Sequence, residues 1–374
     1  MYVVILAGGG GTRLWPLSTP DRPKPFLPLV GDRTLLQRAV DRLSPLIEAV
    51  DVTVVTDRRY VALVRAQLPD VRILAEPTGR NTAAAVALAV AAIDRPDEEV
   101  MLVLPADQLI DPEREGVYRG VLAAAASDLA GDAFGIVEPL VTIGIQVDRP
   151  ATEYGYLIPD LERGNEIQGL QEYPLKAFVE KPTAGRAATL QHEPGVAWNA
   201  GIFLWRRAAI RDAIERYTGL LTMLGPAIGS PSALAAAYDR LTPISIDYAV
   251  MEGAAQDGLV VMAAMDVGWS DLGGWPALLA ALGAGAAGRV VPPGRVVPPG
   301  RVVPPGRVVP PGEAVALGPD DLLIERRDGV LAVVDGPRGS ISATTPTALL
   351  VGAAVDRPIV DALVERVAAQ EVRG

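Results

Sequence analysis

Residues 3–17 read VVILAGGGGTRLWPL, a short apolar strand that opens directly into four consecutive glycines. Successive glycines let backbone N–H groups approach an anion closely, and Arg13 adds a positive charge to the same loop. Prolines at positions 16, 20, 23, 25 and 28 prevent a helix from starting after the glycines. We therefore expect a long loop that wraps an anion and delivers two cations, Arg13 and Lys24.

A dinucleotide-binding Rossmann site also begins with a strand followed by glycines. That site requires the glycine loop to run directly into a helix, with an acidic residue ~20 positions further on. The prolines that follow Gly11 disfavour this arrangement. A Rossmann dehydrogenase is therefore the weaker interpretation of the loop.

Strand-like and helix-like segments alternate over roughly the first 110 residues. The expected strands are residues 3–6, 52–55, 71–75 and 100–104, and the expected helices are residues 35–43, 60–68 and 82–93. This alternation predicts an α/β fold with a Rossmann-like, doubly wound, mostly parallel sheet. Ligands of such sheets bind at the carboxyl ends of the strands, so the loops after Leu6, Ala75 and Leu104 are the places where chemistry is expected.

The chain is expected to contain three parts: a catalytic domain over residues 1–285, a linker over 286–312, and a small β-rich domain with a terminal helix over 313–374. Residues 288–311 are four copies of GRVVPP. Paired prolines favour an extended polyproline II linker. A hexapeptide β-helix is the alternative, although Pro-Pro in every unit interrupts its ladders. In the last part the expected strands are 314–317, 322–326, 330–334 and 348–351, and the expected helix is 360–370.

Composition narrows the chemistry. The chain has no cysteine and a single histidine, which disfavours Cys- or His-based nucleophilic catalysis and excludes disulfides. A net charge of −11 argues against a nucleic-acid or membrane-surface binder. No apolar stretch approaches the ~20 residues needed to span a bilayer, so we expect neither a signal peptide nor a membrane span, and a cytoplasmic protein.

Lysine is rare in this chain. Only Lys24, Lys176 and Lys181 stand among 34 basic residues, the rest being arginine. A lysine that persists in such a background indicates a need for a compact ammonium group. The alternative is codon bias that left three lysines by accident.

Eight motifs, in order, carry a family resemblance. They are residues 8–24 (GGGGTRLWPL, then PK at 23–24), 76–83 (EPTGRNTA), 104–107 (LPAD), 154–156 (YGY), 178–182 (FVEKP), 198–203 (WNAGIF), 245–248 (SIDY) and 268–275 (GWSDLGGW). This series resembles the sugar nucleotidyltransferases, most of all the mannose-1-phosphate guanylyltransferase branch. The resemblance is strong over about residues 1–280 and looser over 313–372.

The resemblance implies that an oxygen of a sugar 1-phosphate attacks the α-phosphorus of a nucleoside triphosphate in line. The nucleophile is already anionic, so no general base is needed, and catalysis consists of positioning and charge neutralisation. GTP and mannose 1-phosphate are the expected substrates and Mg²⁺ the expected cofactor. No nucleic acid or membrane partner is expected, and a homodimer is left open.

The resemblance also assigns roles to residues. Arg13, Lys24, Asp107 and Lys181 are the expected catalytic residues. Asp107 and Asp271 are the expected metal ligands. Residues expected at the nucleotide are Leu6, Gly8, Gly9, Gly10, Gly11, Thr12, Arg13, Glu76, Gly79, Asn81, Thr82 and Asp107. Residues expected at the sugar phosphate are Gly155, Glu180, Lys181 and Asn199.

Each role has a structural alternative. Asp107 and Asp271 could be turn aspartates, and Asn81 could be the N-cap of the following helix. Asp247 is equally a helix cap or a site residue. The tryptophans are expected to pack, and His192 to be structural or exposed.

Other functions remain open at this point. Ala200 stands where a serine is common in the family, and the absence of a phosphomannose isomerase domain predicts a monofunctional enzyme. The closest rival is transfer to another sugar 1-phosphate, glucose or a heptose, or from another nucleotide. A rival of a different class is a non-catalytic paralogue that only binds nucleotide sugar.

Overall fold

The computed structural model describes residues 1–9, 12–14, 18–129, 133–167, 170–274, 277, 278 and 281, and four strands between 322 and 352. The chain divides into two compact units. The first comprises Met1–Gly9 and Leu36–Trp269, and the second comprises Gly10–Leu35 and Ser270–Gly374.

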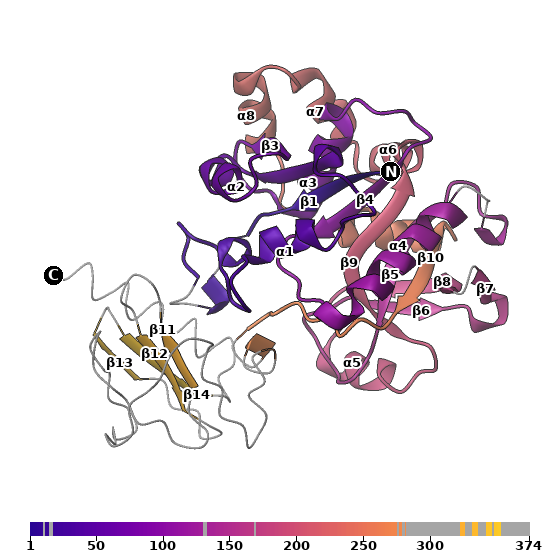
Figure 1. Cartoon of the computed structure of the whole chain (residues 1–374). Coiled ribbons are helices and arrows are strands. Elements are labelled where there is room, and N and C mark those ends of the chain that lie inside the picture. Colours follow the sequence, from indigo (N-terminus) through magenta and orange to yellow (C-terminus); the bar gives the residue numbers. More distant parts are fainter. Residues whose placement is uncertain are drawn as a thin grey trace. The chain divides into compact units, whose positions relative to one another are not determined.

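A mixed sheet forms the centre of the first unit (Figure 1). Over the residues described there, ten strands pair in the order β3-β2-β1-β4-β9-β5-β10-β8-β6, with β7 at the side of β8. They are β1 (Tyr2–Leu6), β2 (Val52–Asp57), β3 (Arg72–Glu76), β4 (Val100–Pro105), β5 (Leu140–Gln146), β6 (Tyr156–Pro159), β7 (Asn165–Ile167), β8 (Leu170–Val179), β9 (Ala197–Arg206) and β10 (Val260–Met265). The strands β3-β2-β1-β4 all run parallel, which confirms the predicted α/β class.

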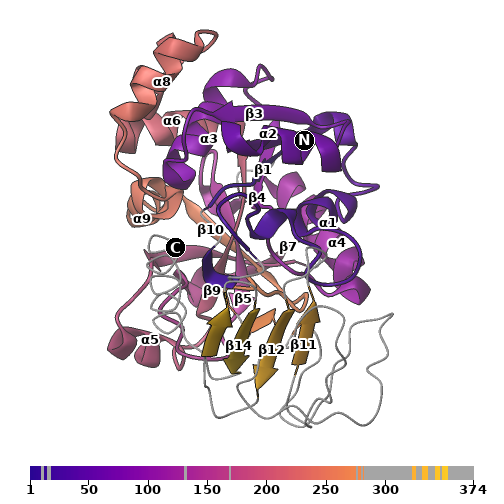
Figure 2. The same cartoon turned by 90° about the vertical axis from the view of Figure 1, so that its left-hand side faces the viewer.

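Helices connect these strands and flank the sheet, with α6 and α4 on opposite sides of it (Figures 1 and 2). The α-helices are α1 (Leu35–Asp41), α2 (Val61–Gln67), α3 (Asn81–Ala92), α4 (Glu115–Asp128), α5 (Ala184–Leu190), α6 (Arg207–Thr218), α7 (Leu220–Leu224), α8 (Pro231–Asp239) and α9 (Glu252–Gln256). Short 3₁₀ turns are η1 (Thr12–Leu14), η2 (Lys24–Phe26), η3 (Ala49–Asp51), η4 (Arg58–Tyr60), η5 (Pro112–Arg114), η6 (Ala133–Gly135), η7 (Leu161–Arg163) and η8 (Gly225–Ala227), and η9 (Asp247–Met251) is a π-helical turn. The three predicted helices are confirmed to within two residues at each end.

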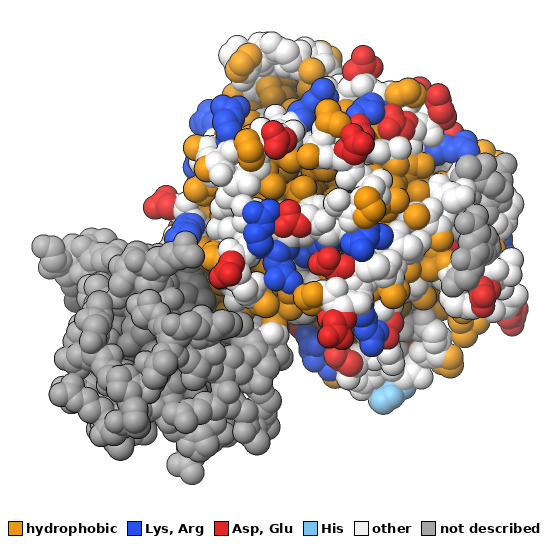
Figure 3. All heavy atoms as spheres, viewed as in Figure 1, with side chains coloured by type: hydrophobic (Ala, Val, Ile, Leu, Met, Phe, Trp, Pro, Cys, Tyr) orange, Lys and Arg blue, Asp and Glu red, His pale blue; other side chains and the backbone are white. Residues whose placement is uncertain are grey.

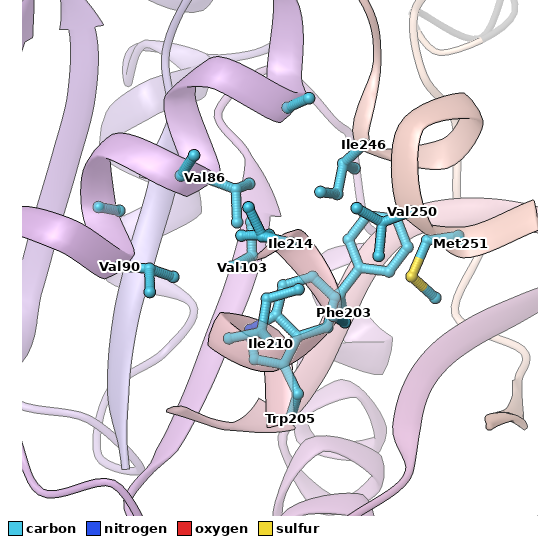
Figure 4. Close-up of a cluster of buried hydrophobic side chains, with 14 of the residues drawn as sticks. Val86, Val90, Val103, Phe203, Trp205, Ile210, Ile214, Ile246, Val250 and Met251 are labelled. Atoms are coloured by element: carbon cyan, nitrogen blue, oxygen red, sulfur yellow. The ribbon is translucent and has the colours of Figure 1, made fainter. Parts of the chain in front are cut away.

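The central strands are buried on both faces. Val4 and Val103 belong to the main hydrophobic cluster, together with residues of α3, α6 and η9 (Figure 4). Their strand neighbours Val3 and Leu102 are equally buried, and they point to the opposite face because side chains alternate along a strand. Burial on both faces explains why these segments read as continuous apolar runs.

Helix α3 is buried almost all round, from Ala83 to Val90. Its sequence alternates alanine with Val and Leu, so small side chains let neighbouring elements approach closely. A helix that is apolar on every side belongs inside the protein.

The chain order places a topological switch at β1. The chain passes from β1 to β2 and β3 on one side, and then returns to β4 on the other side. Leu6 pairs with Pro105, and the Ala106 N–H donates to the Leu6 carbonyl at 3.0 Å. The loops that begin at Ala7 and Ala106 therefore leave the sheet from adjacent strands, at the position where doubly wound sheets bind ligands.

The second unit contains a four-stranded sheet in the order β11-β12-β14-β13. Its strands are β11 (Leu322–Glu325), β12 (Leu331–Asp335), β13 (Ser342–Thr345) and β14 (Ala348–Gly352). Three of the predicted strands are present, and β13 was not predicted. The predicted strand 314–317, the linker 286–312 and the helix 360–370 lie outside the described residues, and the division of the chain into three parts stays a prediction. Of the helices that can be described, none is long and apolar enough to cross a membrane.

Candidate active site

The glycine loop starts from a firmly held backbone. The Ala7 N–H donates to the Val55 carbonyl at 2.9 Å, and the Thr56 hydroxyl donates to the Ala7 carbonyl at 2.6 Å. Gly9 has φ +115°, a conformation that favours glycine. Among the described atoms, none lies within 4 Å of where a Cβ on Gly8 or Gly9 would stand. The start of the loop is therefore open to a bulky ligand that approaches the backbone.

Other residues of this loop are only partly described. Leu6 is half-buried at the end of β1. Gly10, Gly11 and the side chain of Thr12 lie outside the described part of the structure. Their expected roles at the nucleotide stay predictions.

Asp107 follows the end of β4 and is half-buried. It stands two residues beyond Pro105, as Gly8 stands two residues beyond Leu6, the residue paired with Pro105 in β1. Next to it, the Gln108 carbonyl accepts a hydrogen bond of 3.0 Å from the buried guanidinium of Arg42. Arg42 was not predicted, because an arginine at the end of a helix reads as a solvated cation.

Glu76 lies at the carboxyl end of β3 and is 5% exposed. Burial raises the pKa of its carboxyl to about 7, and Asp57 nearby adds to the effect. The Tyr238 hydroxyl donates to Glu76 Oε1 at 3.4 Å. This carboxyl therefore exchanges a proton near neutral pH.

Asp57 holds the loop that follows Glu76. The Gly79 N–H donates to Asp57 Oδ2 at 3.2 Å, and Arg59 donates from its backbone and side chain. Although burial opposes it, these bonds hold the pKa of Asp57 below its usual range. Gly79 itself is exposed, and no described atom lies within 4 Å of where a Cβ on it would stand. Asp57 was missed, because nothing in its local sequence marks an aspartate that binds 22 residues away.

The alternative role of Asn81 as an N-cap is wrong. Helix α3 begins at Asn81 itself, and Arg80 is the N-cap, without a capping side-chain bond. Asn81 has φ +67°, and its Oδ1 accepts a hydrogen bond of 2.8 Å from the backbone N–H of Thr82. The Thr82 hydroxyl in turn accepts a bond of 2.8 Å from the Ile246 N–H. The left-handed backbone of Asn81 turns its side chain to the neighbouring residue instead of into the first turn.

Three of the four expected sugar-phosphate residues form one cluster around Gly155. Lys181 Nζ lies 2.5 Å from Glu180 Oε1, and the Lys181 side chain is 48% exposed while that of Glu180 is 6% exposed. A Cβ on Gly155 would come within 2.5 Å of Glu180 Oε2, so any larger residue there would displace the Glu180 carboxylate. The Gly155 carbonyl also accepts a hydrogen bond of 2.8 Å from the Asn199 N–H. The ammonium group is thus available to a ligand, and the carboxylate is fixed beside it.

Asn199 is the fourth expected residue and joins the same cluster. Its Oδ1 accepts hydrogen bonds from the Thr142 hydroxyl at 2.8 Å and from the Gly201 N–H at 3.0 Å. Its Nδ2 donates to Asp247 Oδ1 at 2.8 Å. Asp247 is the first residue of η9, and Ile246 is the N-cap, so the cap interpretation of Asp247 is wrong.

Electrostatics in this cluster favour protonated carboxyls. Burial, the neighbouring Asp247 and Glu252 raise the pKa of Glu180 to about 7, against the effect of Lys181. Burial also raises the pKa of Asp247. Among the described residues, Lys181 is the cation that acts on both acids. Neutral carboxyls beside this ammonium would favour the binding of a further anion.

The remaining expected residues belong to the second unit. Arg13 is exposed in η1. Lys24 begins η2, and its Nζ donates to the backbone carbonyl of Asp271. The Asp271 carboxylate accepts the Gly273 N–H at 2.9 Å and so stabilises its own turn. The structure therefore brings Lys24 and Asp271 together.

A joint metal site of Asp107 and Asp271 stays a prediction, because the two residues belong to different units. Within the residues described, no three acidic or histidine side chains gather closely enough to hold a metal by themselves. Asp107 supplies a hard carboxylate oxygen beside a loop of exposed glycines, which fits Mg²⁺ bound together with phosphate oxygens.

The tryptophans and the histidine behave as expected where they are described. Trp198 and Trp205 are buried, and the Trp269 ring meets Tyr154 edge-on at 5.5 Å. His192 is exposed, and its ring is the pale blue side chain at the surface in Figure 3. On the same face, acidic and basic side chains are interspersed (Figure 3).

Comparisons with known proteins identify the family of this chain. A family model described as nucleotidyl transferase matches residues 2–286, well over half of the chain. The chain is 37% identical over 292 residues to a mannose-1-phosphate guanylyltransferase of Sinorhizobium fredii, covering 73% of this chain and 53% of that one. It is 35% identical over 297 residues to the mannose-1-phosphate guanylyltransferase of Escherichia coli K12, covering 74% and 59%.

A solved structure is also similar. The crystal structure of mannose-1-phosphate geranyltransferase from Thermus thermophilus has a TM-score of 0.65 and 34% identity, covering 76% of this chain and 80% of that chain. The chain spans little more than half the length of the curated relatives it matches. The family match and the central sheet agree, and the chain belongs to the nucleotidyl transferase family.

Proposed function

We propose that this chain transfers GMP from GTP to mannose 1-phosphate, producing GDP-mannose and pyrophosphate. The observation that carries the proposal is the cluster of Glu180, Lys181 and Asn199 around Gly155. A half-exposed ammonium beside a fixed carboxylate and an amide matches a ligand with both a phosphate and sugar hydroxyls. The names of the relatives from Sinorhizobium and Escherichia support the choice of mannose and guanine.

In the proposed reaction, a phosphate oxygen of mannose 1-phosphate forms a bond to the α-phosphorus of GTP. The bond from that phosphorus to the bridging oxygen breaks, and its electron pair leaves with pyrophosphate. No proton has to be removed from the nucleophile, so a chain with a single histidine can perform the step. The task of the protein is to hold two polyanions in line and to offset their repulsion.

Each residue has a proposed part in this task. Lys181 binds the phosphate of the sugar, and Glu180 and Asn199 accept or donate hydrogen bonds at its hydroxyls. The backbone of Gly8 and Gly9 faces the triphosphate, and the segment from Glu76 to Thr82 faces the base. Arg13 and Lys24 neutralise the reacting phosphates.

Asp107 and Asp271 are the proposed ligands of Mg²⁺. The ion supplies charge neutralisation at phosphate oxygens when it is bound. Replacement of Asp107 by asparagine keeps the size of the side chain but removes its charge. We expect Asp107→Asn to lower kcat by about 100-fold or more, with an unchanged melting temperature.

A pyrophosphate-release assay with four nucleoside triphosphates and several sugar 1-phosphates tests the proposal. We expect the highest turnover with GTP and mannose 1-phosphate, and only when a divalent metal is present. Equal or faster turnover with UTP and glucose 1-phosphate would show that the chain has another activity of the family. Full activity in EDTA would show that the reaction needs no divalent metal. Binding of GDP-mannose without any turnover would favour the non-catalytic paralogue.

A further inference from the structure

The backbone N–H and the backbone carbonyl of Glu180 are both held by one short helical segment. Its N–H donates to Glu252 Oε1 at 2.9 Å. Its carbonyl accepts a hydrogen bond of 3.1 Å from the Tyr248 hydroxyl. Tyr248 and Glu252 are four residues apart on the continuous segment of η9 and α9, so they project from neighbouring positions on one face.

The residue that follows Glu180 has an unusual backbone conformation. Lys181 has φ +45°, which is strained for a lysine. Its N–H donates to the Tyr154 carbonyl at 3.2 Å, and its ammonium lies 6.0 Å from the centre of the Tyr248 ring. Such a conformation persists only where surrounding contacts hold it. The bonds to Tyr248 and Glu252 are contacts of this kind.

The segment that supplies these contacts is anchored in the core. Ile246, Val250 and Met251 are at most 1% exposed and pack in the main hydrophobic cluster near Phe203 (Figure 4). Tyr248, in contrast, is 45% exposed. One side of the segment is therefore fixed in the core, and the other side reaches the turn that carries Glu180 and Lys181.

We propose that Tyr248 and Glu252 are positioning residues for the sugar phosphate: they clamp the backbone of Glu180 on both sides of its Cα and thereby fix the direction in which Lys181 presents its ammonium. This inference rests on the proposed function, because it takes Lys181 as the group that binds the phosphate. Neither residue needs to touch the substrate. Their effect is on substrate binding more than on the chemical step.

The clamp also has an electrostatic consequence. The charged groups that face Glu180 are Lys181, Asp247 and Glu252, and the last two raise the pKa of its carboxyl. Removal of the Glu252 charge alone would therefore lower the pH at which Glu180 ionises. The hydrogen bond from the Glu180 N–H needs only an oxygen acceptor, which a glutamine retains.

Four single variants separate these effects. Glu252→Ala removes the acceptor, Glu252→Gln keeps an acceptor but removes the charge, and Tyr248→Phe removes one hydroxyl. Tyr217→Phe is the matched control. The Tyr217 hydroxyl donates to Asp257 Oδ2 at 2.6 Å, at the other end of the same helical segment, so this variant also removes a hydroxyl but leaves the contacts to Glu180 in place. Steady-state kinetics with GTP and mannose 1-phosphate are measured for each, together with melting temperature and calorimetric binding of mannose 1-phosphate alone.

We expect Glu252→Ala to raise KM for mannose 1-phosphate about ten-fold and Tyr248→Phe about three-fold, with kcat and the KM for GTP within about two-fold of wild type. Glu252→Gln should keep KM within about three-fold of wild type. Its profile of KM against pH should lie at lower pH than that of Tyr217→Phe. The titration of the substrate itself is common to all variants and cancels in this comparison.

Three results would overturn the clamp: an unchanged KM in Glu252→Ala and Tyr248→Phe, equal damage in Glu252→Ala and Glu252→Gln, or a loss in Tyr217→Phe as large as in Tyr248→Phe. A wild-type protein that binds mannose 1-phosphate without turnover would refute the proposed reaction, while the calorimetric affinities of the variants would still test the clamp. A wild-type protein that binds no sugar 1-phosphate would overturn both.

Discussion

Asn199 and Asp247 form a directed pair: the Asn199 amide donates to Asp247 Oδ1 at 2.8 Å, while Asn199 Oδ1 accepts two other hydrogen bonds. The pair joins strand β9 to η9, 48 residues apart. The donors Thr142 and Gly201 determine which end of the amide faces Asp247. Position 199 therefore needs a side chain that accepts hydrogen bonds at one atom and donates at the other, as an amide does.

This relationship predicts the effect of exchanging the two residues. Asn199→Asp places a second carboxylate against Asp247 in a buried setting, and we expect it to lower the free energy of unfolding by about 2–3 kcal/mol near neutral pH. The double variant Asn199→Asp with Asp247→Asn restores one donor between the two side chains. We expect it to recover more than half of the lost stability in urea denaturation. Equal stability of the single and double variants would contradict the pairing.

Gly155 predicts a second outcome. A Cβ there would lie 2.5 Å from Glu180 Oε2 and 3.1 Å from the Phe178 ring. Gly155→Ala should displace the Glu180 carboxylate, raise KM for mannose 1-phosphate about ten-fold and cost roughly 1–3 kcal/mol of stability. Gly185→Ala in α5 is the control, because a Cβ there has no described atom within 4 Å. An alanine in a helix should stabilise that variant by roughly 0.5–1 kcal/mol, without any change in KM.

The three lysines predict a third set of outcomes. Lys181→Arg should mainly raise KM for the sugar phosphate, because a planar guanidinium differs in reach and donor geometry from an ammonium. Lys24→Arg should lower kcat about ten-fold. Lys176→Arg should be silent, since Lys176 forms an ion pair of 3.2 Å with Asp160 and is about half exposed. If kinetics show the same effect for all three, the lysines are remnants of codon bias.

Glu76 predicts a dependence of stability on pH. Its pKa in the folded protein is raised from 4.5 to about 7, so the folded state binds more protons than the unfolded state between these values. The stability associated with neutral Glu76 is fully present below the unfolded pKa and is lost as pH rises through the folded pKa. The loss amounts to about 3 kcal/mol, the free energy equivalent of this shift.

Glu76→Gln tests this directly, because glutamine stays neutral and retains an acceptor for the Tyr238 hydroxyl. We expect the melting temperature of the variant to rise relative to that of wild type between pH 4.5 and about pH 7, the unfolded and folded pKa values of Glu76. The gain should level off above the folded pKa. A difference between the two proteins that does not change with pH would show that Glu76 titrates at its ordinary value.

Local sequence was sufficient for the first half of the sheet. The apolar segments at β1, β2, β3 and β4 are continuous because the central strands are buried on both faces. The order of strands and helices then implied a parallel arrangement. The glycines after β1 and the aspartate after β4 could be predicted to lie on loops at one edge, because parallel strands end at the same edge of a sheet.

Residues that act through distant partners carried no such signal. Asp57, Arg42 and Glu252 bind backbone groups that are 22, 66 and 72 residues away. An acidic or basic residue at a helix or strand end usually faces solvent, so their sequence context favoured a surface position. The N-cap prediction for Asn81 was wrong for a local reason, because its left-handed backbone removes the geometry that an N-cap requires.

The sequence by itself determined the order of strands, helices and loops over roughly the first 105 residues, and it predicted which groups carry charge to phosphates. Hydrophobic runs, glycines, prolines and rare lysines act over a few residues, so their consequences can be read without a fold. Only the tertiary structure decided how Glu180, Lys181 and Asn199 are held, since that depends on β8, β9 and η9 meeting around Gly155. Hydrogen bonds and the burial of carboxyls depend on distances across the packed protein, and these do not exist until distant segments come together.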